Sequence, residues 1–145
     1  MVSSGVRQRS SHIGALLLEA QRRFNDELVG RLHRRGFTTI KPSHGAVFAN
    51  IDAEGTRATE LASRAGMTKQ SMGELIADLE AKGYVERRPD PRDRRARVVV
   101  LTTAGKEVDR AADEIIGRIE RAHERRLGER RFRELKELLG RLNSD

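Results

Sequence analysis

The amino-acid sequence predicts a mainly helical protein, with six helices and one small two-stranded β-hairpin. Two patterns in the 145 residues give this prediction. Apolar residues recur at steps of three and four over most of the chain, which is the period of an amphipathic helix. Near position 85 the period changes, and a turn with proline and aspartate leads to the β-branched run Val98, Val99 and Val100, which favours paired strands.

The first predicted helix is long and amphipathic, and it ends at Gly36. Its apolar face consists of Ile13, Leu17, Ala20, Phe24, Leu28 and Leu32. A short second helix is predicted to start at Pro42 and Ser43 and to stop before Gly55. The Ser43 hydroxyl is expected to cap free backbone N–H groups there, because a side-chain oxygen at a helix start satisfies donors that the helix leaves unpaired.

The third and fourth predicted helices have the spacing of a helix-turn-helix. The third runs from Thr56 to Gly66, where glycine can adopt the left-handed conformation of a tight turn. The fourth is capped by Thr68 and ends at Gly83. Its apolar stripe is Met72, Leu75, Ile76 and Leu79. This turn is expected to swing the fourth helix across the third, as in a DNA-reading motif.

The outward face of the fourth predicted helix is polar and carries little charge. It contains Thr68, Lys69, Gln70, Ser71 and Glu74. Glutamine pairs with adenine, serine serves several bases, and lysine contacts guanine or phosphate, so we expect this face to bind DNA. Taken alone, the same pattern also fits an ordinary solvated helix face.

The predicted hairpin is strongly basic at its tip. Residues 87–97 contain six arginines and two aspartates, which gives a net charge of +4. Arginine suits phosphate and the narrow minor groove, while Asp90 and Asp93 are expected to orient neighbouring arginines. A basic hairpin at this distance after a helix-turn-helix is a wing, so residues 43–101 are predicted to form a winged helix-turn-helix. The remaining expected DNA contacts are Ser43, Arg57, Arg92, Arg94, Arg95 and Arg97.

Two further helices are predicted within residues 103–143, with a break at Gly128. Thr102 is expected to cap the first of them. Their apolar positions are Val108, Ala112, Ile115, Ile119, Ala122, Phe132, Leu135, Leu138, Leu139 and Leu142. Together with residues 12–36 they carry more apolar surface than a single domain of residues 1–145 can bury. We therefore expect the N-terminal and C-terminal helices to form a homodimer interface.

Composition and charge exclude several classes of function. A net charge of +7 favours a polyanionic partner, while the absence of cysteine excludes disulfides, thiolate metal sites and thiol-based redox sensing. The chain has no Ser-His-Asp order and no phosphate-binding glycine loop, so we expect neither an enzyme nor a cofactor. The apolar runs are too short to span a membrane, and residues 1–11 lack the core of a signal peptide. A cytoplasmic protein without a membrane partner is therefore expected.

The four histidines are scattered too widely to predict a metal site. His44 leaves three interpretations open. It is expected to be a partly buried structural residue, a phosphate contact at a helix N-terminus, or a hydrogen-bonding group for a small effector.

Several segments resemble one known family of regulators. Asp93-Arg94-Arg95, followed after five residues by Leu101-Thr102, resembles the wing signature of the MarR (multiple-antibiotic-resistance regulator) family. Residues 59–62 (TELA), 67–71 (MTKQS) and 79–85 (LEAKGYV) occur in the order and spacing of that family. The resemblance implies a winged-helix homodimer whose first and last helices interleave. It also implies that a small phenolic or anionic ligand releases the DNA, as in many members. The third interpretation of His44 rests on this implication and places His44 with Phe24 and Phe48 in a cleft between the dimer helices and the reading domain.

The resemblance assigns roles to individual residues. Arg95 matches the wing arginine that enters the minor groove, and Asp93 matches the acid that steadies the wing. Lys69, Gln70, Ser71 and Glu74 fall on the recognition helix. The chain departs from the peroxide-sensing branch of the family because it lacks the sensing cysteine.

These observations together predict a transcriptional regulator that binds double-stranded DNA in a sequence-specific manner. We expect a repressor that binds a palindromic operator as a homodimer and that a small aromatic or anionic ligand can release. The alternatives are a sequence-indifferent architectural or RNA-binding protein and a protein-protein adaptor on the same scaffold. The positive wing disfavours the adaptor, because an adaptor wing should be neutral or acidic.

Overall fold

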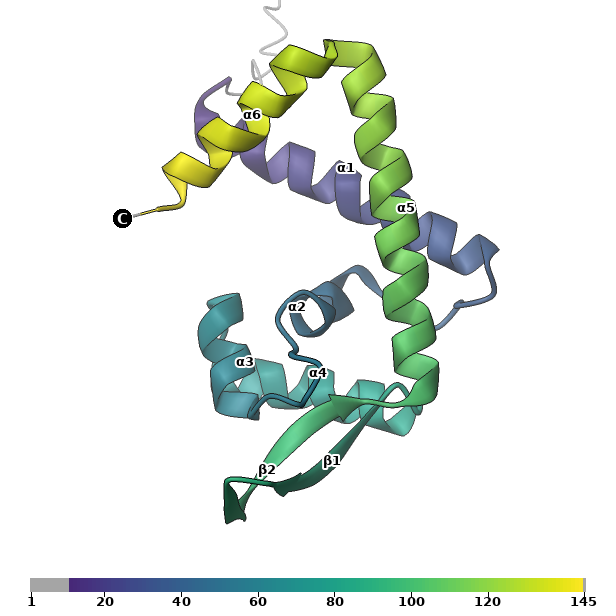
Figure 1. The fold of residues 1–145 in the computed structure, drawn as a ribbon, viewed down its shortest axis with the longest axis vertical. Coiled ribbons are helices and arrows are strands. Elements are labelled where there is room, and N and C mark those ends of the chain that lie inside the picture. The colour runs from purple at the N-terminus through teal and green to yellow at the C-terminus, as the bar shows by residue number, and fades with distance from the viewer. Residues whose placement is uncertain (1–10, 145) are drawn as a thin grey trace, which may run out of the picture.

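The computed structural model describes residues 11–144, and its helices and hairpin confirm the predicted fold class (Figure 1). The elements in chain order are α1 (Ile13–Arg34), a 3₁₀ turn η1 (Pro42–His44), α2 (Gly45–Phe48), α3 (Ala58–Ala65), α4 (Lys69–Ala81), β1 (Val85–Asp90), β2 (Asp93–Leu101), α5 (Thr103–Leu127) and α6 (Glu129–Leu142). Most of the segment in which no signal peptide is expected, residues 1–11, lies outside the described residues.

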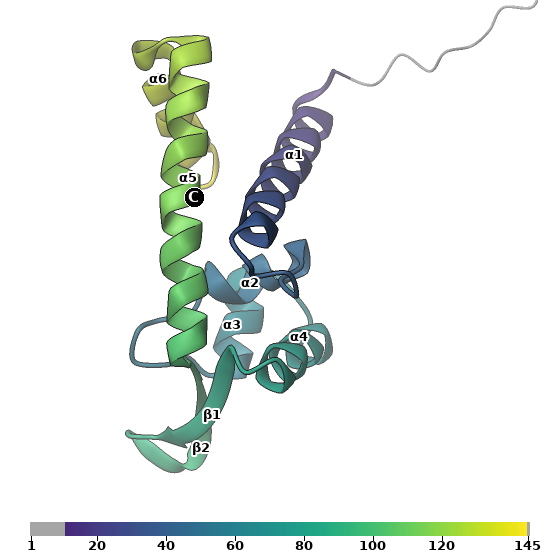
Figure 2. The ribbon, with the colours of Figure 1, turned by 90° about the vertical axis from the view of Figure 1, so that its right-hand side faces the viewer.

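The long helix α5 connects two ends of the molecule. Figures 1 and 2 show α4 and the β1–β2 hairpin at one end of α5 and α6 folded back at the other end. α1 packs against α5, while α2, α3 and α4 form a cluster beside the hairpin. The reading elements, α4 and the hairpin, are therefore attached to a helical frame that consists of α1, α5 and α6.

The helix-turn-helix forms as the sequence predicts. Met72, Ile76 and Leu79 of α4 are completely buried, and Leu61 of α3 is buried against the same core. Gly66 ends α3 with φ +63°, which is the left-handed conformation that glycine adopts without steric cost. The apolar stripe of α4 therefore fixes which of its residues face outward.

One predicted helix start and one predicted cap were wrong. Thr56 does not begin α3, because its backbone pairs with Val99 in an isolated β-bridge and its side chain is buried. Ser43 does not cap α2, because it lies inside the 3₁₀ turn. The backbone N–H of Lys41, at the start of that turn, donates to His44 Nδ1 at 2.9 Å instead. In both cases a contact from another part of the fold replaces a local capping signal.

Two glycines allow other segments to pack closely against the hairpin. Gly55 has φ +102°, and a Cβ there would lie 2.7 Å from Val100 Cγ1. Gly105 begins the contact between α5 and the hairpin, and a Cβ there would lie 2.1 Å from the carbonyl oxygen of Tyr84. The cap residue Thr102 accepts the Gly105 N–H at 3.1 Å, as predicted, and donates to the Gly83 carbonyl at 2.6 Å.

We predict that Gly105→Ala destabilises the protein by about 1–3 kcal/mol, because the added methyl group meets backbone atoms that cannot move aside. The control is Gly117→Ala in the same helix, where a Cβ would be 3.5 Å from the flexible end of Arg121. That variant should gain about 0.5–1 kcal/mol, since alanine is the better helix former. Urea unfolding of both variants measures this, and equal stabilities would contradict the packing described.

Candidate nucleic-acid interface

The outward face of α4 presents free polar side chains. Lys69, Gln70 and Glu74 are exposed, and within residues 11–144 their side chains form no hydrogen bond or ion pair. Thr68 and Ser71 are already engaged with each other. Thr68 Oγ1 accepts the Ser71 N–H at 3.1 Å and donates to the Ser71 hydroxyl at 2.9 Å. Of the five residues predicted on this face, three are therefore free to read a partner, and two hold the start of the helix.

The middle of the same face has no side chain. Gly73 lies inside α4, and a Cβ there would meet nothing within 4 Å. Glycine inside a helix costs about 0.5–1 kcal/mol relative to alanine, and here the fold does not require it. Its absence of a side chain lets another molecule approach the helix backbone between Gln70 and Ala77.

The wing is a two-stranded antiparallel ribbon whose tip is exposed and basic. Its register runs from Val85 opposite Leu101 to Asp90 opposite Asp93. In β1, Arg87 and Arg88 pair with the carboxylates of Glu80 and Glu86. The arginines around the tip and in β2 are solvent-accessible, and their side chains pair with no carboxylate of the described chain. They are Arg92, Arg94, Arg95 and Arg97.

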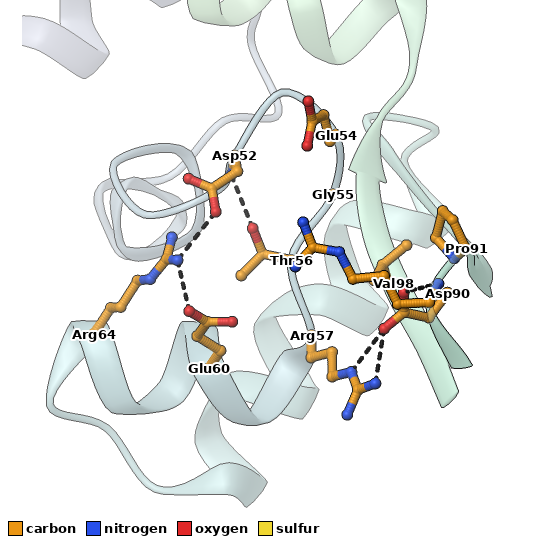
Figure 3. A pocket seen from close by; sticks show the side chains of 11 residues that line it. Asp52, Glu54, Gly55, Thr56, Arg57, Glu60, Arg64, Asp90, Pro91 and Val98 are labelled. Carbon is orange, nitrogen blue, oxygen red and sulfur yellow. Dashed lines mark hydrogen bonds and ion pairs between the residues drawn. The ribbon is translucent and has the colours of Figure 1, made fainter. Parts of the chain in front are cut away.

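One ion pair ties the wing to the start of α3. Figure 3 shows Arg57 reaching the carboxylate of Asp90, with 2.9 Å from Nε and 2.8 Å from Nη2 to the same oxygen. The other oxygen of Asp90 accepts the backbone N–H of Arg92 at 2.9 Å. These hydrogen bonds, that from the Arg92 N–H above all, hold the pKa of Asp90 below its usual range. Asp90 is therefore a negative charge at the base of the wing turn.

Asp93 plays a smaller part at the same turn. Its Oδ1 accepts the backbone N–H of Arg95 at 3.0 Å, and its other oxygen lies 4.0 Å from Arg57 Nη2. Both aspartates thus act on neighbouring arginines through the backbone, in line with the sequence interpretation. The link from Asp90 to Arg57 was missed, because the two residues are separated by 33 positions and no local pattern pairs them. Arg57, predicted as a DNA contact, uses part of its guanidinium for this link.

A polar pocket of about 520 Å³ lies between the α3 start, the loop before it and the wing turn (Figure 3). Arg64 lines it and donates to Asp52 at 3.0 Å, to Glu60 at 2.6 Å and to the carbonyl of Asn50 at 2.7 Å. The charged side chains on that side of the pocket are therefore already paired with one another. They brace the loop that leads into α3.

His44 is a core residue that holds the recognition helix. Its side chain is buried, and Nδ1 accepts the Lys41 N–H, so Nε2 carries the proton and donates to Asp78 Oδ2 at 2.6 Å. Asp78 lies on α4 and also accepts from Lys82 at 2.9 Å. Lys82 first and His44 second lower the pKa of Asp78 to about 2. Burial lowers the pKa of His44 despite the opposing effect of Asp78, so the neutral ring is favoured.

A cavity is present in the region where the effector cleft is predicted, but His44 is not part of it. A cavity of about 560 Å³ lies among α1, α2, the α3–α4 turn, α4 and α5, and both Phe24 and Phe48 line it. Ser43, predicted as a DNA contact, also lines it. His44 does not line it, because the ring turns into the core toward Asp78. Of the three interpretations of His44, the structure supports the structural one.

Neither a metal cluster nor a membrane-spanning helix is found in the described part of the chain. Across residues 11–144, no three histidine, aspartate or glutamate side chains gather as a metal site requires. In the same range no helix is long and apolar enough to cross a membrane.

We predict a pH dependence of stability that originates at His44. Its folded-state pKa is depressed, so its contribution to stability is present above the unfolded value of 6.5 and is lost as the pH falls through the folded value. His44→Asn keeps an acceptor for the Lys41 N–H and removes the titration. Between about pH 8 and pH 5, the free energy of unfolding should fall more in the wild type than in this variant. Parallel losses in both proteins would rule out His44 as the origin.

Comparisons with known proteins agree with this geometry. Residues 38–96 match the model of the MarR family. Transcriptional regulator HosA from Escherichia coli O111:H- is 33% identical to this chain over 87 residues. That match covers 54% of this chain and 64% of HosA, so the chain spans just under two thirds of the length of this curated relative.

Solved structures resemble the chain over most of its length. The transcriptional repressor CouR, bound to a 23-mer DNA duplex, has a TM-score of 0.74 at 24% identity, with 99% of each chain covered. The reduced form of MarR from E. coli has a TM-score of 0.77 at 22% identity, with 93% of this chain and 98% of that chain covered. These likenesses establish the fold, and the family match covers α3, α4 and most of the hairpin. Residues 38–96, the central part of the chain, are therefore similar in sequence to the MarR family.

Proposed function

We propose that this protein is a transcriptional regulator that binds double-stranded DNA in a sequence-specific manner, and that it acts as a repressor. The observation that carries the proposal is the presence of a free polar face on α4 beside a wing in which Arg92, Arg94, Arg95 and Arg97 pair with no carboxylate of the described residues. Lys69, Gln70 and Glu74 are suited to base edges and phosphates in the major groove. The relative CouR, described as a repressor bound to a DNA duplex, supports the repressor role.

The wing is proposed to bind the backbone and the adjacent minor groove. Arg95 lies beside the turn that Asp90 and Asp93 order, so its side chain extends from a fixed backbone. A narrow minor groove concentrates negative potential, and arginine is attracted there. Arg94 and Arg97 are assigned to phosphates, which supply affinity without sequence preference.

A homodimer is proposed because the helices outside the reading domain expose large apolar side chains. α6 buries no residue within the described chain, and Leu135, Leu138 and Leu142 are 42%, 52% and 61% exposed. On α1, Leu16 and Leu18 are 53% and 74% exposed. A symmetric partner that covers both surfaces would place two copies of α4 in successive major grooves of a palindromic operator.

Release of DNA by a small molecule is proposed to act through the cavity that Phe24 and Phe48 line. The cavity borders α1 and α5 of the frame as well as Met67 and Leu75 of the reading domain. A ligand there would favour the dimer arrangement in which the two recognition helices are wrongly spaced for DNA. Ser43 lines this cavity, and it is also proposed as a DNA contact.

Alanine substitutions in the recognition helix and in the wing should weaken DNA binding in different ways. On a duplex selected for tight binding, Gln70→Ala should cost roughly 1–3 kcal/mol while affinity for random duplex stays nearly unchanged. Arg95→Ala should weaken binding most where the flanks are rich in A·T pairs. Arg94→Ala should weaken every duplex alike and lower the slope of log affinity against log salt by about 0.9 for each phosphate that the protein no longer neutralises.

Fluorescence anisotropy on both duplexes measures these effects, and Glu107→Gln on the outer surface of α5 is the control. Equal losses on selected and random duplex for Gln70→Ala, with no effect of Arg95→Ala, would favour the sequence-indifferent architectural or RNA-binding alternative. In that case the proposed function would be withdrawn.

The proposed dimer should depend on the exposed leucines of α6. The wild type is expected to sediment at twice the mass of one chain, with an interface above roughly 2,000 Å². Replacing Leu138 and Leu142 together by glutamate should shift sedimentation toward the monomer, because two charges cannot be buried without partners. Glu137→Gln, on the same exposed helix, should leave the dimer intact. A folded wild-type monomer at micromolar concentration would refute the dimer.

A further inference from the structure

We infer that the cavity between the helical frame and the reading domain takes an amphipathic organic cation, such as an aryl-alkyl ammonium compound. This ligand class is opposite in charge to the anionic class that the family resemblance implies. The cavity is the one through which DNA release is proposed, so the regulatory meaning of such a ligand rests on the proposed function. The binding of the ligand to the cavity does not rest on that function.

The walls of the cavity are mostly apolar. Side chains from four helices and the α3–α4 turn provide this surface, and several of them are large enough to pack against an aromatic ring of a ligand. They are Phe24, Leu28, Phe48, Met67, Leu75, Ala112 and Ile116. The volume of about 560 Å³ falls within the range of small-molecule sites, which is about 300–1,000 Å³.

Within residues 11–144, the charged residues that line the cavity are all negative. Asp109 and Asp113 lie four residues apart on α5, so they share one face of that helix. The described lining contains no lysine, arginine or histidine. The remaining polar side chains are neutral: Gln21, Asn25, Ser43 and Asn50.

Neither carboxylate is neutralised by a residue of the described chain. No ion pair joins Asp109 or Asp113 to a cation within residues 11–144. Burial raises the pKa of Asp109, and repulsion from Asp113 adds to this effect. A positive group in the cavity would remove this repulsion, whereas a carboxylate or phenolate ligand would add a third negative charge. The faces of Phe24 and Phe48 also attract cations.

The ligand would contact both parts of the protein at once. Asp109 and Ile116 belong to α5 of the frame, while Met67 and Leu75 belong to the turn and the recognition helix. A cation held at the α5 carboxylates would therefore place its apolar part against the elements that present α4. This position couples its binding to the orientation of the reading face.

Three probes with the same ring and similar length test the charge preference. They are 2-(2-naphthyl)ethylammonium, 2-(2-naphthyl)ethanol and 3-(2-naphthyl)propionate. Calorimetric titration of the full chain without DNA should give affinities in the order ammonium, alcohol, carboxylate, with at least about a tenfold difference between the first and the last. A carboxylate that binds as tightly as the ammonium compound, or no binding by any of the three, would overturn the inference.

Variants assign the preference to the two carboxylates. Asp109→Asn and Asp113→Asn should each reduce ammonium affinity and leave alcohol affinity unchanged, and both should raise the melting temperature because a repulsion is relieved. Glu107→Gln, an exposed change of the same kind on α5 outside the cavity, should alter neither affinity. Unchanged ammonium affinity in both asparagine variants would overturn the assignment.

A separate titration of the protein-DNA complex with the ammonium probe distinguishes this inference from the proposed function. Binding to the free protein with no effect on any duplex would retain the cation site and reject its role in DNA release. A failure of DNA binding itself would reject the proposed function and leave the calorimetric result standing.

Discussion

The completely buried face of α4 is the constraint on which the reading surface depends. Met72, Ile76 and Leu79 have no exposed surface, and burial of each such side chain contributes roughly 1.5–3 kcal/mol. Rotation of the helix would expose them, so Lys69 and Gln70 must face outward. The hydrogen bond from His44 to Asp78 adds a polar tie between this helix and the segment before α2. The buried side chains of α4 and the hydrogen bond to Asp78 therefore determine which residues form the recognition face.

The wing is tied to the helix-turn-helix because the loop before α3 contacts the hairpin. Thr56 pairs with Val99 of β2, and the next residue, Arg57, is the N-cap of α3 and binds Asp90 at the wing turn. The close approach of Gly105 to Tyr84 then joins this unit to α5. The reading elements and α5 therefore meet at a close backbone contact.

Local signals in the sequence predicted the helices, the wing and the caps at Thr68 and Thr102, since each depends on residues within a few positions. Contacts between distant segments were not predictable in this way. The Arg57 to Asp90 pair joins residues 33 positions apart, and His44 finds Asp78 across 34. The cavity residues Phe24 and Phe48 were identified by resemblance. The neighbouring carboxylates on α5 were not predicted as a site, because one helix alone does not show what surrounds them.

Two copies of α4 and of the wing are proposed to read a defined DNA sequence. Selection of bound duplexes from a random pool by the full-length wild-type chain tests this claim most directly. We expect an enriched motif with two inverted half-sites, their centres about 10 base pairs apart and A·T-rich steps where the wings reach. A pool that remains random although the protein binds it at physiological salt would contradict this expectation.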